Sequence, residues 1–363
     1  MTMFQNLEPN KIAPNLKPPE GSEHLHPQAR ALFEENPINV QVLSKLENES
    51  ILKVKQFDKE TVIELAKLAA ILEDFHIAPY HVLDGKIATT AFFEASTRTR
   101  LSFESAVQRL GGRILSIPEG GVTGVKKGES LEDIGEMFNA YCDMVIMRHT
   151  ETDCLKRILK HLRVPLINAG NGTGEHPTQA LADWYALLKW RPGLADEKDD
   201  KMLNLGILGT PGQMRAVKSF LLMSLLFRRK IRKVTVISEM ADPFGLDITE
   251  ALDGADIDYE VTNDIQEALP TLDVIYMNSI ALLGESYQQL GNRYMLNSES
   301  KLKPESVILH PLARLKELDT SLDNTQHNLY FTQAHGAVFI RQALLISVFG
   351  RLDRLPDDIP LLK

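Results

Sequence analysis

Short strand-like runs alternate with amphipathic helical runs along most of this chain, and this alternation restricts the fold more than any other feature. Four runs in the first half are apolar and rich in β-branched or aromatic residues, as buried strands are: 87–93, 113–117, 143–149 and 164–170. Helical periodicity is present nearby, at 61–75 and 129–141. Strands that alternate with helices predict an α/β domain with a largely parallel sheet.

A second series of the same kind follows a helical segment at 180–190. Its helical run is 215–227, and its strand-like runs are 203–209, 233–239, 273–279, 306–311 and 328–333. The length of 363 residues also suggests two domains. We therefore expect two α/β domains joined through the helix near 178–190. A last helix, with Ala337, Ile340, Leu344 and Val348 on one stripe, is compatible with packing on either domain. Residues 1–44 show little periodicity and are predicted to be an N-terminal extension.

Composition excludes several classes of function. The net charge is −9, which disfavours binding to nucleic acid or to anionic membranes. No stretch reaches the roughly 18 consecutive apolar residues of a membrane helix, and the N-terminus does not resemble a secretory signal. The two cysteines, Cys142 and Cys154, have no metal-ligand spacing and are interpreted as free thiols. We expect a soluble cytoplasmic protein without a metal or other cofactor.

Polar or cationic residues follow five of the predicted strands. These strand ends are 96–100, 148–149, 168–179, 209–215 and 310–314. Because ligands of open α/β sheets bind beyond the carboxyl ends of the strands, a cleft between two domains is expected to gather these residues.

The stretch 96–100, Ser-Thr-Arg-Thr-Arg, lies between a predicted strand and a predicted helix. Free N–H groups and the positive end of the helix dipole meet at such a junction. Hydroxyl and guanidinium groups placed there favour an anion, most naturally a phosphate. An ordinary helix cap with two solvated arginines remains the alternative at this point.

Five motifs together resemble the aspartate/ornithine carbamoyltransferase family, and the resemblance extends from about 45 to 352. The motifs are FFEASTRTRLSFE, GVKKGESLED, MRH, HPTQALAD and HPLAR. The last of these is closer to the aspartate branch than to the Cys-containing motif of the ornithine branch. The resemblance implies two doubly wound parallel-sheet domains with the active site in the cleft between them. It places a carbamoyl phosphate-binding domain at 45–178, with helix 336–352 packing back on it, and an amino acid-binding domain at 179–335.

The resemblance also implies a role for each matching residue in a transfer from carbamoyl phosphate to an amine, most simply that of L-aspartate in pyrimidine biosynthesis. Catalytic roles fall on Arg98, Thr99, Arg148 and His176, of which Thr99, Arg148 and His176 would stabilise charge on the carbonyl oxygen. Carbamoyl phosphate would be bound by Ser96, Thr97, Arg98, Thr99, Thr123, Lys127, Arg148, His176, Gln179 and the backbone carbonyl of Leu312. Thr123 and Lys127 resemble residues of a mobile loop that enters a neighbouring subunit's site, which implies a homotrimer with shared active sites and allows a higher assembly.

The acceptor side departs from the family pattern. The residues expected to contact the acceptor are Lys127, Arg215, Ser279 and Leu312. Ser279 and Ala281 stand where an arginine and a glutamine are expected, and Arg293 is a candidate substitute. A missing charge-assisted contact is worth about 1.5–3 kcal/mol, enough to alter substrate preference.

Three alternatives stay open at this point. The first is a carbamoyltransferase with a different amine acceptor. The second is a non-catalytic regulatory protein that binds carbamoyl phosphate. The third is a nucleotide-dependent enzyme, suggested loosely by Gly206, Gly209 and Gly212 after a strand and by Glu239 after the next one.

Overall fold

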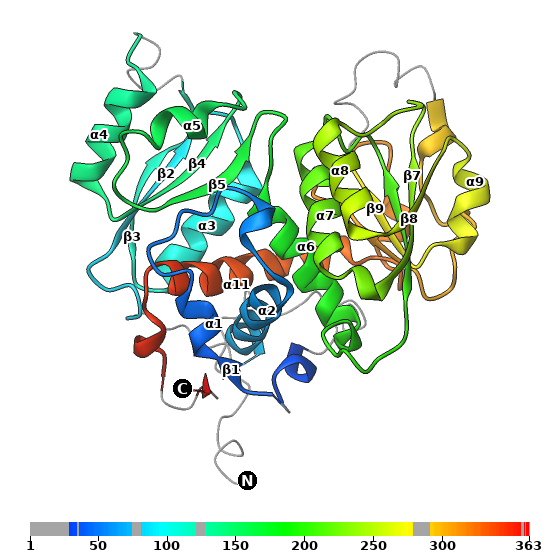
Figure 1. The fold of residues 1–363 in the computed structure, drawn as a ribbon, viewed down its shortest axis with the longest axis horizontal. Helices are drawn as coiled ribbons and strands as arrows, with labels where there is room; N and C mark the ends of the chain where they lie inside the picture. Colours follow the sequence, from blue (N-terminus) through cyan, green and yellow to red (C-terminus); the bar gives the residue numbers. More distant parts are fainter. Residues whose placement is uncertain are drawn as a thin grey trace.

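In the computed structural model, two α/β domains stand side by side on a shared base of helices (Figure 1). The structure describes residues 29–34, 36–74, 81–120, 128–278, 291–356, 359 and 361–362. Among these residues, no helix combines the length and the apolar character that a bilayer span requires.

The first domain contains a four-stranded, fully parallel sheet in the order β3-β2-β4-β5. Its strands are β2 (Ile87–Phe92), β3 (Arg113–Ile117), β4 (Met144–His149) and β5 (Leu166–Asn171). The helices around it are α2 (Lys59–Asp74), α3 (Thr97–Arg109), α4 (Leu131–Tyr141) and α5 (Cys154–Ile158). Apolar residues of α4 and α5 pack on one face of this sheet, and those of α2 and α3 belong to the larger core on the other face.

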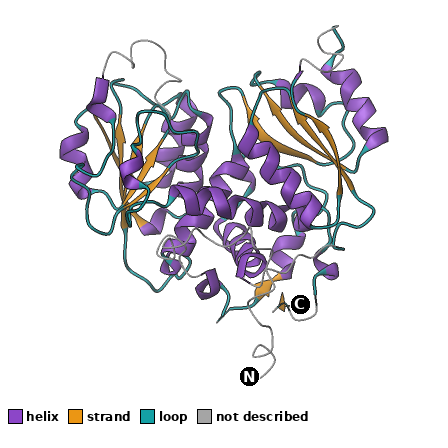
Figure 2. Cartoon of the chain, turned by 180° about the vertical axis from the view of Figure 1, so that it is seen from behind, coloured by secondary structure: helices purple, strands orange, loops and turns teal. Residues whose placement is uncertain are grey.

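The second domain contains a five-stranded parallel sheet in the order β10-β9-β6-β7-β8. Its strands are β6 (Leu203–Leu208), β7 (Ile231–Ile237), β8 (Asp258–Thr262), β9 (Val274–Met277) and β10 (Val307–Leu309). Its helices are α7 (Arg215–Leu226), α8 (Leu246–Ala255) and α9 (Ile265–Ala268). Each sheet lies between layers of helices (Figure 2). The prediction of two doubly wound parallel-sheet domains is therefore confirmed.

Two long helices connect the domains. Helix α6 (Pro177–Trp190) leads from the first sheet to the second, and α11 (Tyr330–Val348) returns from β10 to pack against α2, α3 and α6 (Figure 1). Buried side chains of α2, α6, α7 and α11 form one continuous hydrophobic core with the inner faces of both sheets. Because both sheets pack on this shared core, the carboxyl ends of their strands face a common space between the domains.

The short elements near the termini pair with each other. The extension predicted at 1–44 contains β1 (Ile38–Asn39) and α1 (Val40–Ser44), and β1 pairs in parallel with β11 (Leu361–Leu362). Residues 1–28 lie outside the described part of the chain.

One predicted strand is wrong. Residues 330–333 begin α11, and the preceding Asn328 makes only an isolated parallel bridge with Ile308. The Asn328 side chain accepts a hydrogen bond from the Phe331 backbone N–H at 3.2 Å. The aromatic run resembled a strand because it is short and apolar, whereas a capped helix start uses the same residues.

Candidate active site

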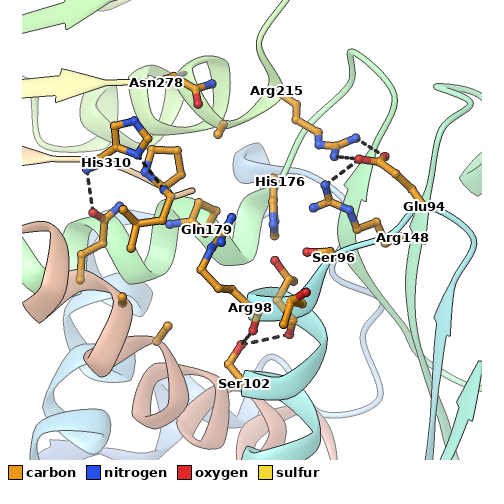
Figure 3. Close-up of a pocket in the computed structure, with 18 of the residues that line it drawn as sticks. Glu94, Ser96, Arg98, Ser102, Arg148, His176, Gln179, Arg215, Asn278 and His310 are labelled. Atoms are coloured by element: carbon orange, nitrogen blue, oxygen red, sulfur yellow. Dashed lines mark hydrogen bonds and ion pairs between the residues drawn. The ribbon is translucent and has the colours of Figure 1, made fainter. Parts of the chain in front are cut away.

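Both sheets reverse their strand order next to a single cavity. In the first sheet the reversal lies between β2 and β4, and in the second between β6 and β9. Loops after such neighbouring strands leave a crevice that binds ligands. A cavity of about 840 Å³ lies at this place (Figure 3). All five predicted strand ends contribute to its lining. The lining residues from these ends are Ser96–Thr99, Arg148, Gly172, Thr173, His176, Gln179, Gln213–Arg215 and His310–Leu312.

The start of α3 forms the anion-binding end of the cavity. Ser96 is the N-cap residue, but its hydroxyl makes no capping hydrogen bond, so it remains available to a ligand. Arg98 follows in the first turn, and its guanidinium has no hydrogen bond or ion pair within the described residues. Its pKa is lowered by burial. Hydroxyls, helix N–H groups and an unpaired guanidinium at one helix start suit a phosphate group.

Glu94 links two arginines across the cavity. Its Oε1 accepts hydrogen bonds from Arg148 Nη2 at 2.6 Å and from Arg215 Nη2 at 2.5 Å, and its Oε2 accepts one from Arg215 Nη1 at 2.8 Å (Figure 3). Arg148 belongs to β4 of the first domain, whereas Arg215 begins α7 of the second. The Glu94 carboxylate is therefore an ionic link between the domains, and sequence reasoning did not single it out.

Electrostatic effects keep this link charged. Burial favours a higher pKa for Glu94, but the hydrogen bond from Arg215 and the charge of Arg148 outweigh burial and hold the pKa below its usual value. Burial, followed by the charge of Arg215, lowers the pKa of Arg148 to about 10, so that Arg148 is a cation at neutral pH. Its Nε is buried without a hydrogen bond among the described residues.

His176 is a buried, neutral imidazole at the start of α6. Its backbone N–H donates to Ser219 Oγ at 2.7 Å, and its Nδ1 lies 3.3 Å from Thr178 Oγ1. Burial, helped by the charge of Arg148, keeps the pKa of His176 well below its usual value. When the Thr178 hydroxyl donates to Nδ1, Nε2 carries the proton. A neutral N–H donor beside cationic groups can polarise a carbonyl oxygen.

Hydrogen bonds from Gln179 and to His310 order the rest of the polar cavity wall. Gln179 donates from Nε2 to Asp183 Oδ1 at 2.7 Å. The Leu312 backbone N–H donates to His310 Nδ1 at 2.8 Å, and His310 Nε2 lies 3.1 Å from Glu317 Oε1. Because Nδ1 is an acceptor, Nε2 carries the proton and donates to Glu317. The predicted residues Gln179 and Leu312 thus both line the cavity.

The candidate replacement for the missing acceptor arginine lies elsewhere. Arg293 binds Glu239 Oε1 at 2.9 Å and the backbone carbonyl of Asn263 at 2.9 Å, and it is not part of the cavity lining. This pairing also engages Glu239, the acidic residue of the nucleotide-dependent alternative. Within the described residues, the predicted acceptor contacts Arg215 and Leu312 both line the cavity from the second domain. Gln213 and Asn278, which were not predicted, line it as well.

Several predicted positions cannot be compared with this geometry. Thr123, Lys127, Ser279 and Ala281 lie outside the described residues. Arg100, the second arginine of the stretch 96–100, forms an ion pair with Glu104 at 3.3 Å. The roles assigned to all of the site residues remain predictions.

Comparison with known proteins identifies the two halves of the chain. Residues 49–189 match the carbamoyl-P binding domain of the aspartate/ornithine carbamoyltransferase family, and residues 201–348 match its Asp/Orn binding domain.

Curated proteins and solved structures agree with this match. The aspartate carbamoyltransferase catalytic subunit of Clostridium acetobutylicum is 34% identical over 304 residues, covering 80% of this chain and 96% of that protein. The chloroplastic aspartate carbamoyltransferase 1 of Pisum sativum is 32% identical over 327 residues, covering 87% and 83%. A crystal structure of Trypanosoma cruzi aspartate transcarbamoylase with carbamoyl phosphate and aspartate is 27% identical, with a TM-score of 0.76 and coverage of 84% and 98%.

The resemblance drawn from the five motifs is thereby confirmed over most of the chain. The protein belongs to the aspartate/ornithine carbamoyltransferase family and is a carbamoyltransferase.

Proposed function

We propose that this protein transfers the carbamoyl group of carbamoyl phosphate to the amine of L-aspartate, giving N-carbamoyl-L-aspartate and phosphate. The observation that carries the proposal is one cavity that contains a phosphate-binding helix start, cationic Arg148 and neutral His176. The named relatives, and the structure solved with carbamoyl phosphate and aspartate, support the same pair of substrates. The reaction is a step of pyrimidine biosynthesis.

Residues at the start of α3 bind the phosphate group of the donor substrate, carbamoyl phosphate. The phosphate binds at Ser96, Thr97 and Arg98, where hydroxyl, N–H and guanidinium groups converge. The carbonyl oxygen then receives hydrogen bonds from Thr99, Arg148 and His176. These donors are strongest when negative charge develops on that oxygen, so they stabilise the tetrahedral transition state more than the bound substrate.

The chemical step is a direct displacement. The neutral amine of the acceptor attacks the carbamoyl carbon, a C–N bond forms, and the C–O bond to phosphate breaks with its electron pair leaving on the phosphate. The transferred amine proton passes to phosphate or solvent. The Gln179 amide oxygen and the Leu312 carbonyl accept hydrogen bonds from the carbamoyl NH₂ group. A lysine from the loop of a neighbouring subunit, Lys127, completes the site in this proposal.

The acceptor carboxylate binds Arg215, the cation of the second domain in the cavity. Glu94 already occupies this guanidinium, so the acceptor must share it or displace Glu94. With Ser279 and Ala281 in place of the expected arginine and glutamine, we expect aspartate to react with a high KM. A different amine acceptor is the second candidate, and the placement of Arg293 away from the cavity favours it over a simple replacement of the arginine.

A panel of amines tests both candidates. Phosphate release from carbamoyl phosphate is measured with L-aspartate, other amino acids and simple amines, with Arg98→Ala as the inactive control. Release that depends on aspartate supports the proposal, and release with another amine alone supports the second candidate. Binding of carbamoyl phosphate without any transfer would favour a regulatory protein instead.

Shared sites in a homotrimer are part of the same proposal. Lys127→Ala and Arg98→Ala proteins should each be nearly inactive, whereas mixed trimers should regain partial activity because some sites then combine two intact halves. No recovery after verified subunit exchange would contradict shared sites. The two buried free thiols, Cys142 and Cys154, are consistent with the proposed cytoplasmic location.

A further inference from the structure

Asp183 is a fully buried carboxylate directly behind the cavity wall. It lies on α6, one turn after Gln179, and it does not itself line the cavity. Its Oδ1 accepts two hydrogen bonds, one from Gln179 Nε2 at 2.7 Å and one from Gln333 Nε2 at 2.5 Å. Burying a carboxylate costs free energy unless hydrogen bonds or a paired charge compensate for the lost solvation, and these two bonds supply part of that compensation.

The orientation of Gln333 is set independently of Asp183. Its Oε1 accepts the backbone N–H of His310 at 2.9 Å, and an N–H group can be bound only by the oxygen end of an amide. The NH₂ end of Gln333 must therefore face Asp183. It follows that Asp183 Oδ1 acts as a hydrogen-bond acceptor.

The same oxygen then decides the orientation of Gln179. Because Oδ1 accepts from Gln333, Gln179 can meet it only with its own NH₂ group. Burial raises the pKa of Asp183 to about 7, and this orientation belongs to the ionised carboxylate, in which Oδ1 carries no proton to donate. The amide oxygen of Gln179 is consequently the end left for a ligand in the cavity.

We propose that Asp183 is a positioning residue that holds the Gln179 amide oxygen toward the cavity and so makes the site selective for an acyl phosphate whose acyl group carries an NH₂ donor. An acyl phosphate with a methyl group at that place leaves the Gln179 oxygen without a partner. This inference rests on the proposed function, because it assigns the carbamoyl amide to Gln179. The Gln333 bond to His310 extends the same network to the loop of Leu312, the second proposed acceptor.

A purely structural role for Asp183 predicts that its replacement changes stability but not ligand preference. Arg341 is also buried, although it contributes to the cavity wall, and the charge of Asp183 raises its pKa against the larger opposite effect of burial. If Asp183 served only as the counter-ion of Arg341, its replacement would change stability but not the choice between an amide and a methyl ligand. Ligand choice is therefore the measurement that separates the two roles.

The test uses two hydrolysis-stable phosphonates that differ at one group. One ends in a carboxamide and the other in the corresponding methyl ketone, and their affinities are measured by calorimetry with the full-length protein. The unmodified protein should prefer the carboxamide. Asp183→Leu, which is similar in volume but has no acceptor, should lower that preference tenfold or more, because a site built for an N–H donor rejects the ligand that lacks it. Asp183→Asn should keep it, since its amide oxygen must still face Gln333.

Controls separate this inference from the proposed function. Gln179→Met should abolish the preference directly, and if it does not, the assignment of the carbamoyl amide to Gln179 is wrong. A folded Asp183→Leu protein that keeps the full preference, while Gln179→Met loses it, would overturn the positioning role alone. If the single variant does not fold, Asp183→Leu combined with Arg341→Met removes both buried charges together and is compared with Arg341→Met.

Discussion

The ionic link at Glu94 leads to a quantitative prediction. Replacing Glu94 by glutamine keeps the size of the side chain but removes its charge and turns one oxygen into an NH₂ group. The oxygen shared by Arg148 and Arg215 can still accept, although from a neutral amide. The bond from Arg215 Nη1 to Oε2, now 2.8 Å long, is lost because two donors would face each other.

The expected loss of stability follows from these three bonds. A hydrogen bond to a charged group contributes about 1.5–3 kcal/mol and a neutral one about 0.5–1.5 kcal/mol. Losing one bond of about 1.5–3 kcal/mol and weakening two others by about 1–1.5 kcal/mol each gives a gross loss of about 3.5–6 kcal/mol. The Glu94 side chain is 26% exposed, and solvent screening reduces the expected free-energy loss to about 2–3 kcal/mol.

Urea-induced unfolding at pH 7 measures this loss, with Glu136→Gln as the matched control. Glu136 pairs with Arg163 at 2.8 Å within the first domain, but both side chains are largely exposed to solvent, so this change should leave the free energy of unfolding almost unchanged. The pKa of Glu94 is lowered in the folded protein, so the link stabilises the fold above pH 4.5 and is lost as the pH falls through the folded-state pKa. The difference between unmodified and Glu94→Gln proteins should shrink over that acidic range.

Phosphate binding provides the second measurement on Glu94→Gln. Removing a negative charge from the cavity should leave phosphate affinity equal or higher. Equal unfolding midpoints for Glu94→Gln and Glu136→Gln would refute the interdomain link. A large fall in phosphate affinity would show that Glu94 acts mainly by orienting Arg148 rather than by joining the domains.

Three further predictions concern single positions. Arg98→Ala should weaken carbamoyl phosphate binding at least tenfold in calorimetry, about 1.5–3 kcal/mol, with little effect on stability, and unchanged affinity in a folded variant would contradict the phosphate assignment. His176→Asn should lower kcat about 100-fold. Because the pKa of His176 is lowered by burial, its contribution to stability is complete above about pH 6.5 and declines below it, a pH dependence that the Asn variant should lack. Gly212→Ala would press a methyl group onto the Phe244 carbonyl oxygen, so the loop before Arg215 must shift, and the KM for the amino acid should rise while donor affinity is retained.

Periodicity predicted the fold well where strands are buried. The central strands β2, β4 and β6 are buried on both faces and mostly apolar, and such runs are recognisable without knowledge of their partners. The edge strand β8 was missed because most of its residues are partly or fully exposed, so it lacks an apolar run. Residues 328–333 were assigned to a strand because helix and strand cannot be separated over six aromatic and polar residues.

The sequence predicted those site residues that belong to a continuous local motif. Ser96–Thr99 belong to a strand-to-helix junction, whose chemistry is visible in the sequence itself. The roles of Glu94 and Asp183 depend on partners that are distant in the chain: Glu94 on Arg148 and Arg215, and Asp183 on Gln333. No spacing rule connects such residues, and only the folded chain brings them together.

The position of α11 determines the order in which the chain can be completed during synthesis. The segment from β6 to β10 is continuous, so the second sheet can form as soon as the ribosome has released it. The first domain must wait, because α2 and α6 are covered by α11, which follows every strand of both large sheets in the chain. A nascent chain therefore carries an open apolar face until α11 has been made. A truncation before Tyr330 should expose that face although all nine strands of the two large sheets are present.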